Sequence, residues 1–190
     1  ERNSANLLNL INQMLDLAKL ENKHIKIDYQ VIDMVELLSD IVHSFQANSS
    51  SKNLNIAFHS TEEELFMNTD REKVRVIVSN LISNAVKFTP EGGSVNLDLS
   101  KNSLEKRVII KVSDTGIGMS SLHLEHIFDR FYQVENTEDT SIGTGIGLSM
   151  VKELVELLNG EITVESEERA GTNFTIVLPN EEVETEIEEE

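Results

Sequence analysis

The stretch "SDTGIGM", Ser113 to Met119, places an aspartate and two glycines directly after an apolar run. Residues 108–113 run apolar like a sheet strand, so Asp114 is expected at a strand end. A carboxylate there can accept a hydrogen bond from an exocyclic amine, the donor that distinguishes the edge of adenine from that of guanine. Gly116 and Gly118 would let a planar ring lie against the backbone. The stretch therefore predicts an adenine site, although aspartate and glycine are also typical of an ordinary surface turn.

Upstream of this stretch, Asp70 to Phe88 has the clearest helical pattern in the chain. Its apolar side chains recur at steps of three and four residues, Asp70 is a candidate N-cap, and Pro90 ends the pattern. Asn80, Asn84 and Lys87 lie along one edge of the apolar stripe. Amide oxygens and an ammonium group at one edge suit magnesium phosphate, whereas the plain alternative is hydrogen bonding between asparagines on a helix surface.

Downstream, "GTGIGLS" (143–149) opens a helix expected over 147–158 and closed by Asn159 and Gly160. Alternating glycines would expose backbone N–H groups at the helix N-terminus, where the partial positive charge favours phosphate. A flexible glycine hinge is the alternative. Neither the dinucleotide fingerprint nor the P-loop pattern occurs, and the protein-kinase signatures HRD and DFG are missing.

The apolar patterns along the chain alternate between helices and short strands. This order predicts a two-layer α/β sandwich of the α/β (α+β) class. A connection of about 25 residues before the glycine cluster is unusual in a compact domain unless it is a lid or a binding segment. Strands are expected at 54–58, 65–67, 95–99, 108–113, 161–165 and 173–178, and further helices at 6–25 and 34–47.

Composition narrows the class of protein. The 190 residues include 34 acidic and 16 basic side chains, which give a formal charge of −18 that repels nucleic acid and anionic membranes. A phosphate ligand would therefore need a metal ion. No cysteine is present, and no apolar run approaches the ~18 residues of a membrane helix, so a cytoplasmic location is expected.

Four stretches, taken together, match a known family. "NLISNAVKFTPEGG" (80–93), "DTGIGM" (114–119), "IFDRFYQ" (127–133) and "GTGIGLS" (143–149) resemble, in order and spacing, the four ATP-site boxes of sensor histidine kinases. The resemblance extends from about Leu7 to Leu178. It implies a Bergerat-type fold, with a mixed sheet packed against three main helices, that holds ATP between its helical layer and a lid.

The resemblance also implies roles for individual residues. Asn84 would coordinate magnesium, Lys87 would contact phosphates, and Phe88 would pack near the nucleotide. Asp114 would bind the adenine amine, helped by Thr172, whose hydroxyl suits a bridging water. The glycine-rich box would wrap the phosphates through Gly143, Thr144, Gly145, Gly147 and Leu148, next to a lid over 119–142 that is anchored by Phe128 and Phe131.

Asn80 and Arg130 are the two further catalytic candidates beside Lys87. Related ATPases of the superfamily carry a glutamate in place of Asn80 to activate water, and an asparagine cannot take a proton in that way. Slow hydrolysis suits a kinase whose nucleophile is a histidine from another domain. Arg130 is a candidate for the γ-phosphate, although a lid arginine can equally pair with a glutamate.

The resemblance divides the chain into residues 1–26, 27–179 and 180–190. The first would be the end of the second helix of a dimerisation and phosphotransfer hairpin, the second the catalytic domain, and the third an acidic tail or linker. The phosphoacceptor motif is absent, and the histidines are expected at the surface or its boundary. The expected partners are this hairpin, a second copy of the chain, and a response regulator or fused receiver domain. The five histidines are His24, His43, His59, His123 and His126.

Two other functions remain open from the sequence. One is a serine-directed anti-sigma kinase of the same fold, against which the N-terminal helix argues. The other is a non-enzymatic, nucleotide-gated dimerisation module, in which binding would order the lid and change packing at Leu7 to Ala18. The four intact boxes favour the histidine kinase.

Overall fold

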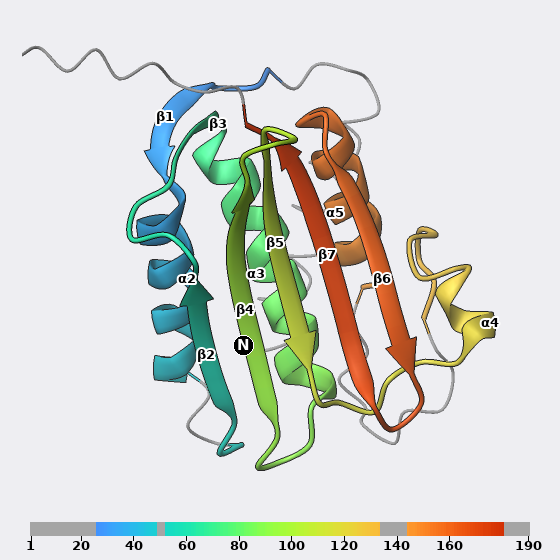
Figure 1. Ribbon diagram of the computed structural model, residues 1–190. Helices are drawn as coiled ribbons and strands as arrows, with labels where there is room; N and C mark the ends of the chain where they lie inside the picture. Colours follow the sequence, from blue (N-terminus) through green and yellow to red (C-terminus); the bar gives the residue numbers. More distant parts are fainter. Residues whose placement is uncertain (1–25, 49–51, 134–143, 181–190) are drawn as a thin grey trace, which may run out of the picture.

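The computed structural model describes residues 26–48, 52–133 and 144–180. They form a two-layer α/β sandwich in which helices cover one face of a five-stranded sheet (Figure 1), as predicted. The helix expected at 6–25 and the acidic tail lie outside the described residues. Within the described ranges no helix is long and apolar enough to cross a membrane.

The large sheet is mixed and has the strand order β2-β4-β5-β7-β6. β2 (Asn55–Ser60) runs parallel to β4 (Ser94–Asn102). β5 (Arg107–Asp114), β7 (Gly171–Pro179) and β6 (Glu161–Glu167) continue the sheet in antiparallel pairs. Along the three central strands every second side chain is buried beneath the helices, as the pleat requires.

Three amphipathic helices supply the second layer: α2 (Met34–Asn48), α3 (Arg71–Phe88) and α5 (Gly147–Leu157). Their apolar faces meet the buried side chains of β4, β5 and β7 in one continuous core. α3 lies between the other two and packs against both. The broad apolar face predicted for this helix is buried at Val74, Ile77, Val78, Leu81, Ile82 and Ala85.

A separate two-stranded sheet joins β1 (Gln30–Asp33) to β3 (Phe66–Thr69). Its strands are antiparallel, with buried Ile32 opposite buried Met67. β1 was not predicted, because four residues carry too little periodicity and its strand geometry depends on the pairing with β3.

Asp70 caps the N-terminus of α3, as its position predicted. The residue is 2% exposed, and its carboxylate accepts hydrogen bonds from the backbone N–H groups of Glu72, Lys73 and Asp28. Its Oδ2 also lies 2.8 Å from Lys73 Nζ. Burial alone would raise the pKa of this carboxyl, but the hydrogen bonds and the Lys73 charge outweigh it and hold the pKa below its ordinary value.

α5 ends in a Schellman motif, which agrees with the predicted stop at Asn159 and Gly160. Asn159 has a left-handed φ of 57°, and its N–H donates to the Glu156 carbonyl at 3.0 Å. The Gly160 N–H donates to the Val155 carbonyl at 2.9 Å. These two bonds satisfy carbonyls that the end of the helix would leave unpaired.

Most differences from the predicted elements are shifts of one to three residues at their ends. The long connection predicted between β5 and α5 contains a short helix, α4 (Ser121–Leu124), which packs beside β6. Four residues make about one helical turn, which is too short for a periodic apolar pattern to be seen in the sequence. We attribute the formation of α4 to its contact with β6.

Asp70→Ala is expected to lower the free energy of unfolding by about 3 kcal/mol, because it removes a cap and leaves buried N–H donors unpaired. Asp70→Asn keeps an oxygen acceptor and loses the charge, so its cost should be about half as large. Urea denaturation of the three proteins measures both values. Equal costs for the two variants would show that the charge, and not the capping oxygen, is what stabilises α3.

Candidate functional site

The end of β5 and the start of β7 place a carboxylate beside a threonine. Asp114 lies directly opposite Thr172 in the antiparallel register, and Thr172 lies opposite Ser166 of β6. The Gly116 N–H donates to Asp114 Oδ1 at 2.8 Å, and the backbone N–H of Thr172 also donates to this carboxylate. The strand-end carboxylate is therefore where the sequence predicted it, held by two backbone donors.

The Asp114 carboxylate is half-buried, and this burial raises its pKa above the ordinary value of 3.8. Desolvation penalises the charged form, and the hydrogen bonds from Gly116 and Thr172 offset only part of that penalty. A partly desolvated carboxylate gains more from one additional well-placed donor than an exposed one does, because less water competes for its lone pairs.

Two glycines allow the backbone segments around Asp114 to pack closely. Gly171 has φ +97°, and a Cβ at this position would overlap the carbonyl oxygen of Asp114. Gly118 has φ +63°, and its Cβ would overlap the carbonyl oxygen of Glu167. The glycines of "DTGIGM" and "AGTNF" thus bring β5, the β6–β7 turn and the start of the lid into contact.

The C-terminal part of α3 adjoins this strand end. The Ile117 N–H donates to the Phe88 carbonyl at 3.2 Å, which ties the segment after Asp114 to the last residue of the helix. Lys87 is half-buried, with its ammonium group 4.8 Å from the centroid of the Phe88 ring, and Phe88 itself is 37% exposed. Asn84 is half-buried one turn earlier.

Asn80 connects α3 to the N-terminus of α5. Its side-chain N–H donates to the Val76 carbonyl at 2.8 Å, which leaves the amide oxygen available on the side of α5. A Cβ on Gly147, the first residue of α5, would lie 2.9 Å from this oxygen. The glycine therefore lets the positive end of α5 approach the polar edge of α3.

The segment before α5 is described from Thr144 onward, and Gly143 lies outside the described residues. Thr144 Oγ1 accepts a hydrogen bond from the Ile146 N–H at 3.3 Å. Leu148 packs partly buried against the core and so fixes the first turn of the helix. The glycine box thus begins a helix at the polar edge, as predicted.

The described part of the predicted lid, residues 119–133, is attached to the core by Ile127 and Phe128. Ile127 is buried, and the Phe128 ring meets the Phe174 ring edge-on with centroids 6.4 Å apart. The prediction that Phe131 is a second apolar anchor is wrong, because its side chain is 58% exposed. Its backbone makes the contact instead, with φ 63° and an N–H that donates to the Gly145 carbonyl at 2.8 Å.

Arg130 pairs with a glutamate, which is one of the two roles that the sequence left open for it. Its guanidinium lies 2.6 Å from Glu153 Oε1 on α5. This ion pair links the described part of the predicted lid to α5, the helix that follows it in the chain.

The histidines in the described residues behave as predicted. His43, His59 and His126 are exposed and His123 is half-buried. His123 and His126 hydrogen-bond to Tyr132 and Asp129 within the lid segment.

Ser166 is the main site residue that sequence reasoning missed. Its hydroxyl contacts the lid start at Met119, the first residue of β7 at Gly171, and Thr172 at once. Ile162, Val164 and Ser166 share one face of β6, so a hydroxyl on an otherwise apolar face was the available signal.

The oxygen donors present suit a metal ion that arrives with phosphate. Magnesium is usually held by one or two protein oxygens together with phosphates and water. Asn84, with Asn80 near it on α3, supplies amide oxygens of this kind. The described part of the chain contains no cluster of three histidine, cysteine or acidic side chains that could hold a metal by itself.

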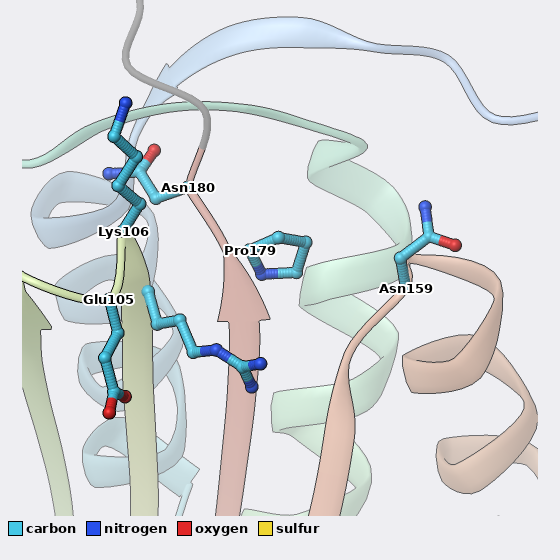
Figure 2. Close-up of a pocket in the computed structure, with 6 residues that line it drawn as sticks. Glu105, Lys106, Asn159, Pro179 and Asn180 are labelled. Atoms are coloured by element: carbon cyan, nitrogen blue, oxygen red, sulfur yellow. The ribbon is translucent and has the colours of Figure 1, made fainter.

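A cavity of about 270 Å³ lies at the opposite end of the sheet (Figure 2). It is formed where β5 begins, where β7 ends and where α5 has ended. None of the predicted site residues lines it, and Asp114 is the length of a strand away, roughly 24 Å. It is therefore separate from the candidate site, and its lining residues are Glu105, Lys106, Arg107, Asn159, Pro179 and Asn180.

A mixed sheet covered by helices, with a carboxylate, polar helix edge and helix N-terminus at one end, defines an ATP-binding α/β sandwich of the Bergerat type. The profile of the family described as "Histidine kinase-, DNA gyrase B-, and HSP90-like ATPase" matches residues 69–182. The chain belongs to this family.

Individual relatives narrow the comparison to sensor kinases. The chain is 33% identical to the sensor histidine kinase WalK of Bacillus subtilis over 93% of its length, and it spans 29% of WalK. Full-length ShkA, solved in complex with AMPPNP, superposes with a TM-score of 0.83 at 30% identity, covering 94% of this chain and 37% of ShkA. The catalytic domain of the histidine kinase ThkA gives 0.70 at 25% identity, covering 80% and 96%.

Gly171→Ala is expected to lower the free energy of unfolding by about 3 kcal/mol or more, because the new Cβ would clash with the backbone of Asp114. In addition, alanine is strained at the positive φ of this position. Gly92→Ala is the matched control, since Gly92 has φ +78° with nothing within 4 Å of its Cβ. Gly92→Ala should lower the free energy of unfolding by only about 1 kcal/mol, which is the strain of an alanine in the left-handed region. Denaturant titration compares them, and similar losses would contradict the close approach of β7 to Asp114.

Proposed function

We propose that this chain is the ATP-binding catalytic part of a sensor histidine kinase. It binds ATP with magnesium and presents the γ-phosphate to a histidine on a hairpin domain. The observation that carries this proposal is that Asp114, the polar edge of α3 and the N-terminus of α5 all lie at one end of the sandwich. A purine amine, a metal ion and phosphates each find a group of suitable chemistry there.

The adenine end of the site is formed by Asp114 and Thr172. Asp114 accepts from the exocyclic amine, and Thr172, opposite it in the sheet, contacts the base through a water. Gly116 and Gly118 keep side chains away from the ring, and Phe88 flanks the nucleotide from the end of α3. The ring plane therefore lies against backbone, and the specificity comes from the base edge.

The phosphate end is formed by α3 and α5. Lys87 supplies a positive charge, and the first N–H groups of α5 supply the positive end of a helix dipole. Asn84 would hold magnesium, which neutralises phosphate charge during the transfer. Gly143, Thr144, Gly145 and Gly147 wrap the phosphates, and Arg130 is the residue of the lid that can reach the γ-phosphate once it leaves Glu153.

Asn80 makes the site a poor hydrolase. Its amide oxygen lies beside the N-terminus of α5, where a carboxylate would be placed to activate water, and an amide cannot accept a proton in that role. The γ-phosphate is thereby kept for a stronger nucleophile than water, such as an imidazole. Transfer needs positioning and charge neutralisation more than a base.

The proposed partners follow from the comparison with sensor kinases. The phosphoacceptor hairpin precedes the catalytic domain, here assigned to residues 27–179, and residues 1–26 would be the end of that hairpin and pair with a second copy. A response regulator would receive the phosphoryl group. The similarity to WalK and to ShkA bound to AMPPNP supports this assignment over an anti-sigma kinase or a dimerisation module.

As the pH is lowered, binding of ADP should be lost at a higher pH than it would be if Asp114 had the pKa of an ordinary aspartate. The ionised Asp114 accepts from the amine, and its raised pKa means that protonation removes this acceptor as the pH falls through a value above 3.8. Calorimetric titration between neutral pH and the onset of acid unfolding measures the midpoint. Asp114→Asn should bind ADP more than tenfold more weakly and lose this pH dependence. A wild-type profile in Asp114→Asn would exclude Asp114 as the titrating group.

The proposal is tested by mixing the chain with a separately expressed phosphoacceptor hairpin from a homologous kinase and γ-labelled ATP. Acid-labile, base-stable label on the hairpin is the expected result, with slow release of phosphate when the hairpin is omitted. Asn84→Ala should abolish the magnesium dependence of nucleotide binding and reduce transfer by at least tenfold. Ser83→Ala, at an exposed position of the same helix, is the control. Labelled serine, or nucleotide binding without any transfer, would favour one of the two alternatives.

A further inference from the structure

Lys52, which lies between α2 and β2, caps the C-terminus of α3, the helix that supplies Lys87 to the proposed phosphate end of the site. Its Nζ donates to the Lys87 carbonyl at 3.0 Å and to the Val86 carbonyl at 3.3 Å. Lys52 itself is half-buried. One ammonium group therefore holds two carbonyls in the last turn of this helix.

The end of α3 leaves these carbonyls without partners inside the helix. The Thr89 N–H makes the last bond of the helical pattern, to the Ala85 carbonyl at 3.0 Å. Pro90 has no N–H, so it cannot donate to Val86 as the next residue of a helix would. The last carbonyls must then be satisfied from elsewhere in the fold, and this end of the helix carries partial negative charge. A lysine ammonium group meets both requirements.

The Phe88 carbonyl has a different partner, because it accepts the Ile117 N–H at 3.2 Å. Ile117 lies in the segment after Asp114, so this bond belongs to the proposed adenine end. Removal of the Lys52 ammonium group would keep the anchor of Phe88 and release the Lys87 carbonyl from Lys52. The last turn of α3 is therefore attached to the adenine end and to Lys52 through separate bonds.

The backbone of Lys52 is bonded to the turn that follows α3. Its carbonyl accepts the Gly92 N–H at 3.3 Å, and the Asn55 N–H at the start of β2 donates to the Gly93 carbonyl at 2.9 Å. These bonds attach the segment before β2 to the chain that leaves α3. The Lys52 ammonium group thus reaches the helix end from a backbone that the fold already holds beside it.

We propose that Lys52 is a positioning residue for the phosphate end of the nucleotide site, acting through Lys87. The inference rests on the proposed function, in which Lys87 contacts the phosphates. Without Lys52, the last turn of α3 can fray, because two of its carbonyls lose a charged donor. Ordering this turn again would then cost part of the free energy of phosphate binding, whereas the capped turn is ordered before the ligand arrives.

The test compares ADP with adenosine, which lacks the phosphates. The measured quantity is the ratio of the dissociation constant of adenosine to that of ADP, obtained by NMR titration of the 190-residue chain with magnesium present. Lys52→Met should lower this ratio about fivefold by weakening ADP binding, which is the size of one net hydrogen bond. A general loss of structure would weaken both ligands alike and leave the ratio unchanged.

Three further variants separate positioning from charge and stability. Lys52→Arg keeps the charge and the donors and should keep the wild-type ratio. Lys101→Met removes a half-buried lysine at the other end of β4 and should leave the ratio unchanged. In a Lys87→Met background, Lys52→Met should have no further effect on the ratio, because the side chain through which it acts is gone.

The outcomes separate this inference from the proposed function. If the wild-type chain binds neither ligand, the proposed function and the role of Lys52 both fail. If it prefers ADP and Lys52→Met keeps the full ratio, the nucleotide site stands and the role of Lys52 is excluded. A fivefold fall that persists in the Lys87→Met background would exclude action through Lys87. If Lys52→Met does not fold, Lys52→Gln, whose neutral amide is a weaker donor, gives the same comparison.

Discussion

The antiparallel pairing of β5 with β7 is the constraint on which the site depends. It puts Asp114 opposite Thr172, although these residues are far apart in sequence, and it places both at the end of the sheet next to α3. Because side chains alternate between the two faces, a slip of one residue would reverse every side chain of a strand. The buried Val108, Ile110 and Val112 of β5 and Phe174, Ile176 and Leu178 of β7 prevent such a slip, so the apolar core sets the register of the polar site.

Close packing of backbone segments makes this end of the sheet suitable for a flat ligand. Gly171 and Gly118 remove the atoms that would separate the β6–β7 turn from β5 and from the start of the lid. The same packing desolvates Asp114 and raises its pKa, which has a cost for the ionised form. Two backbone N–H donors offset part of that cost, and a purine amine would offset more. In the proposed site, the Asp114 carboxylate therefore has hydrogen-bonding capacity that water satisfies only in part and that a ligand amine could use.

Much of the architecture, including the strand end at which Asp114 lies, was predictable, because it follows from local rules. The periodicity of α3, its Asp70 cap, the stop of α5 at Asn159 and the strand before Asp114 each depend on residues near in sequence. Other features could not be predicted, because each depends on a partner that is distant in sequence. They are β1, α4 and the contacts of Phe131 and Arg130. β1 is a strand only beside β3, Phe131 contributes its backbone to Gly145, and Arg130 pairs with Glu153.

The sequence by itself determined the family, the class of fold and the chemical types of the site residues, since motif order, spacing and hydrophobic period are written in the chain. Tertiary structure alone decided which distant groups meet. Lys52 shows the difference: as a lone lysine between a helix and a strand it indicates nothing, but in the fold its ammonium group meets the Val86 and Lys87 carbonyls at the end of α3. The last carbonyls of a helix need partners that the helix itself does not contain, and only the folded chain brings such partners into contact.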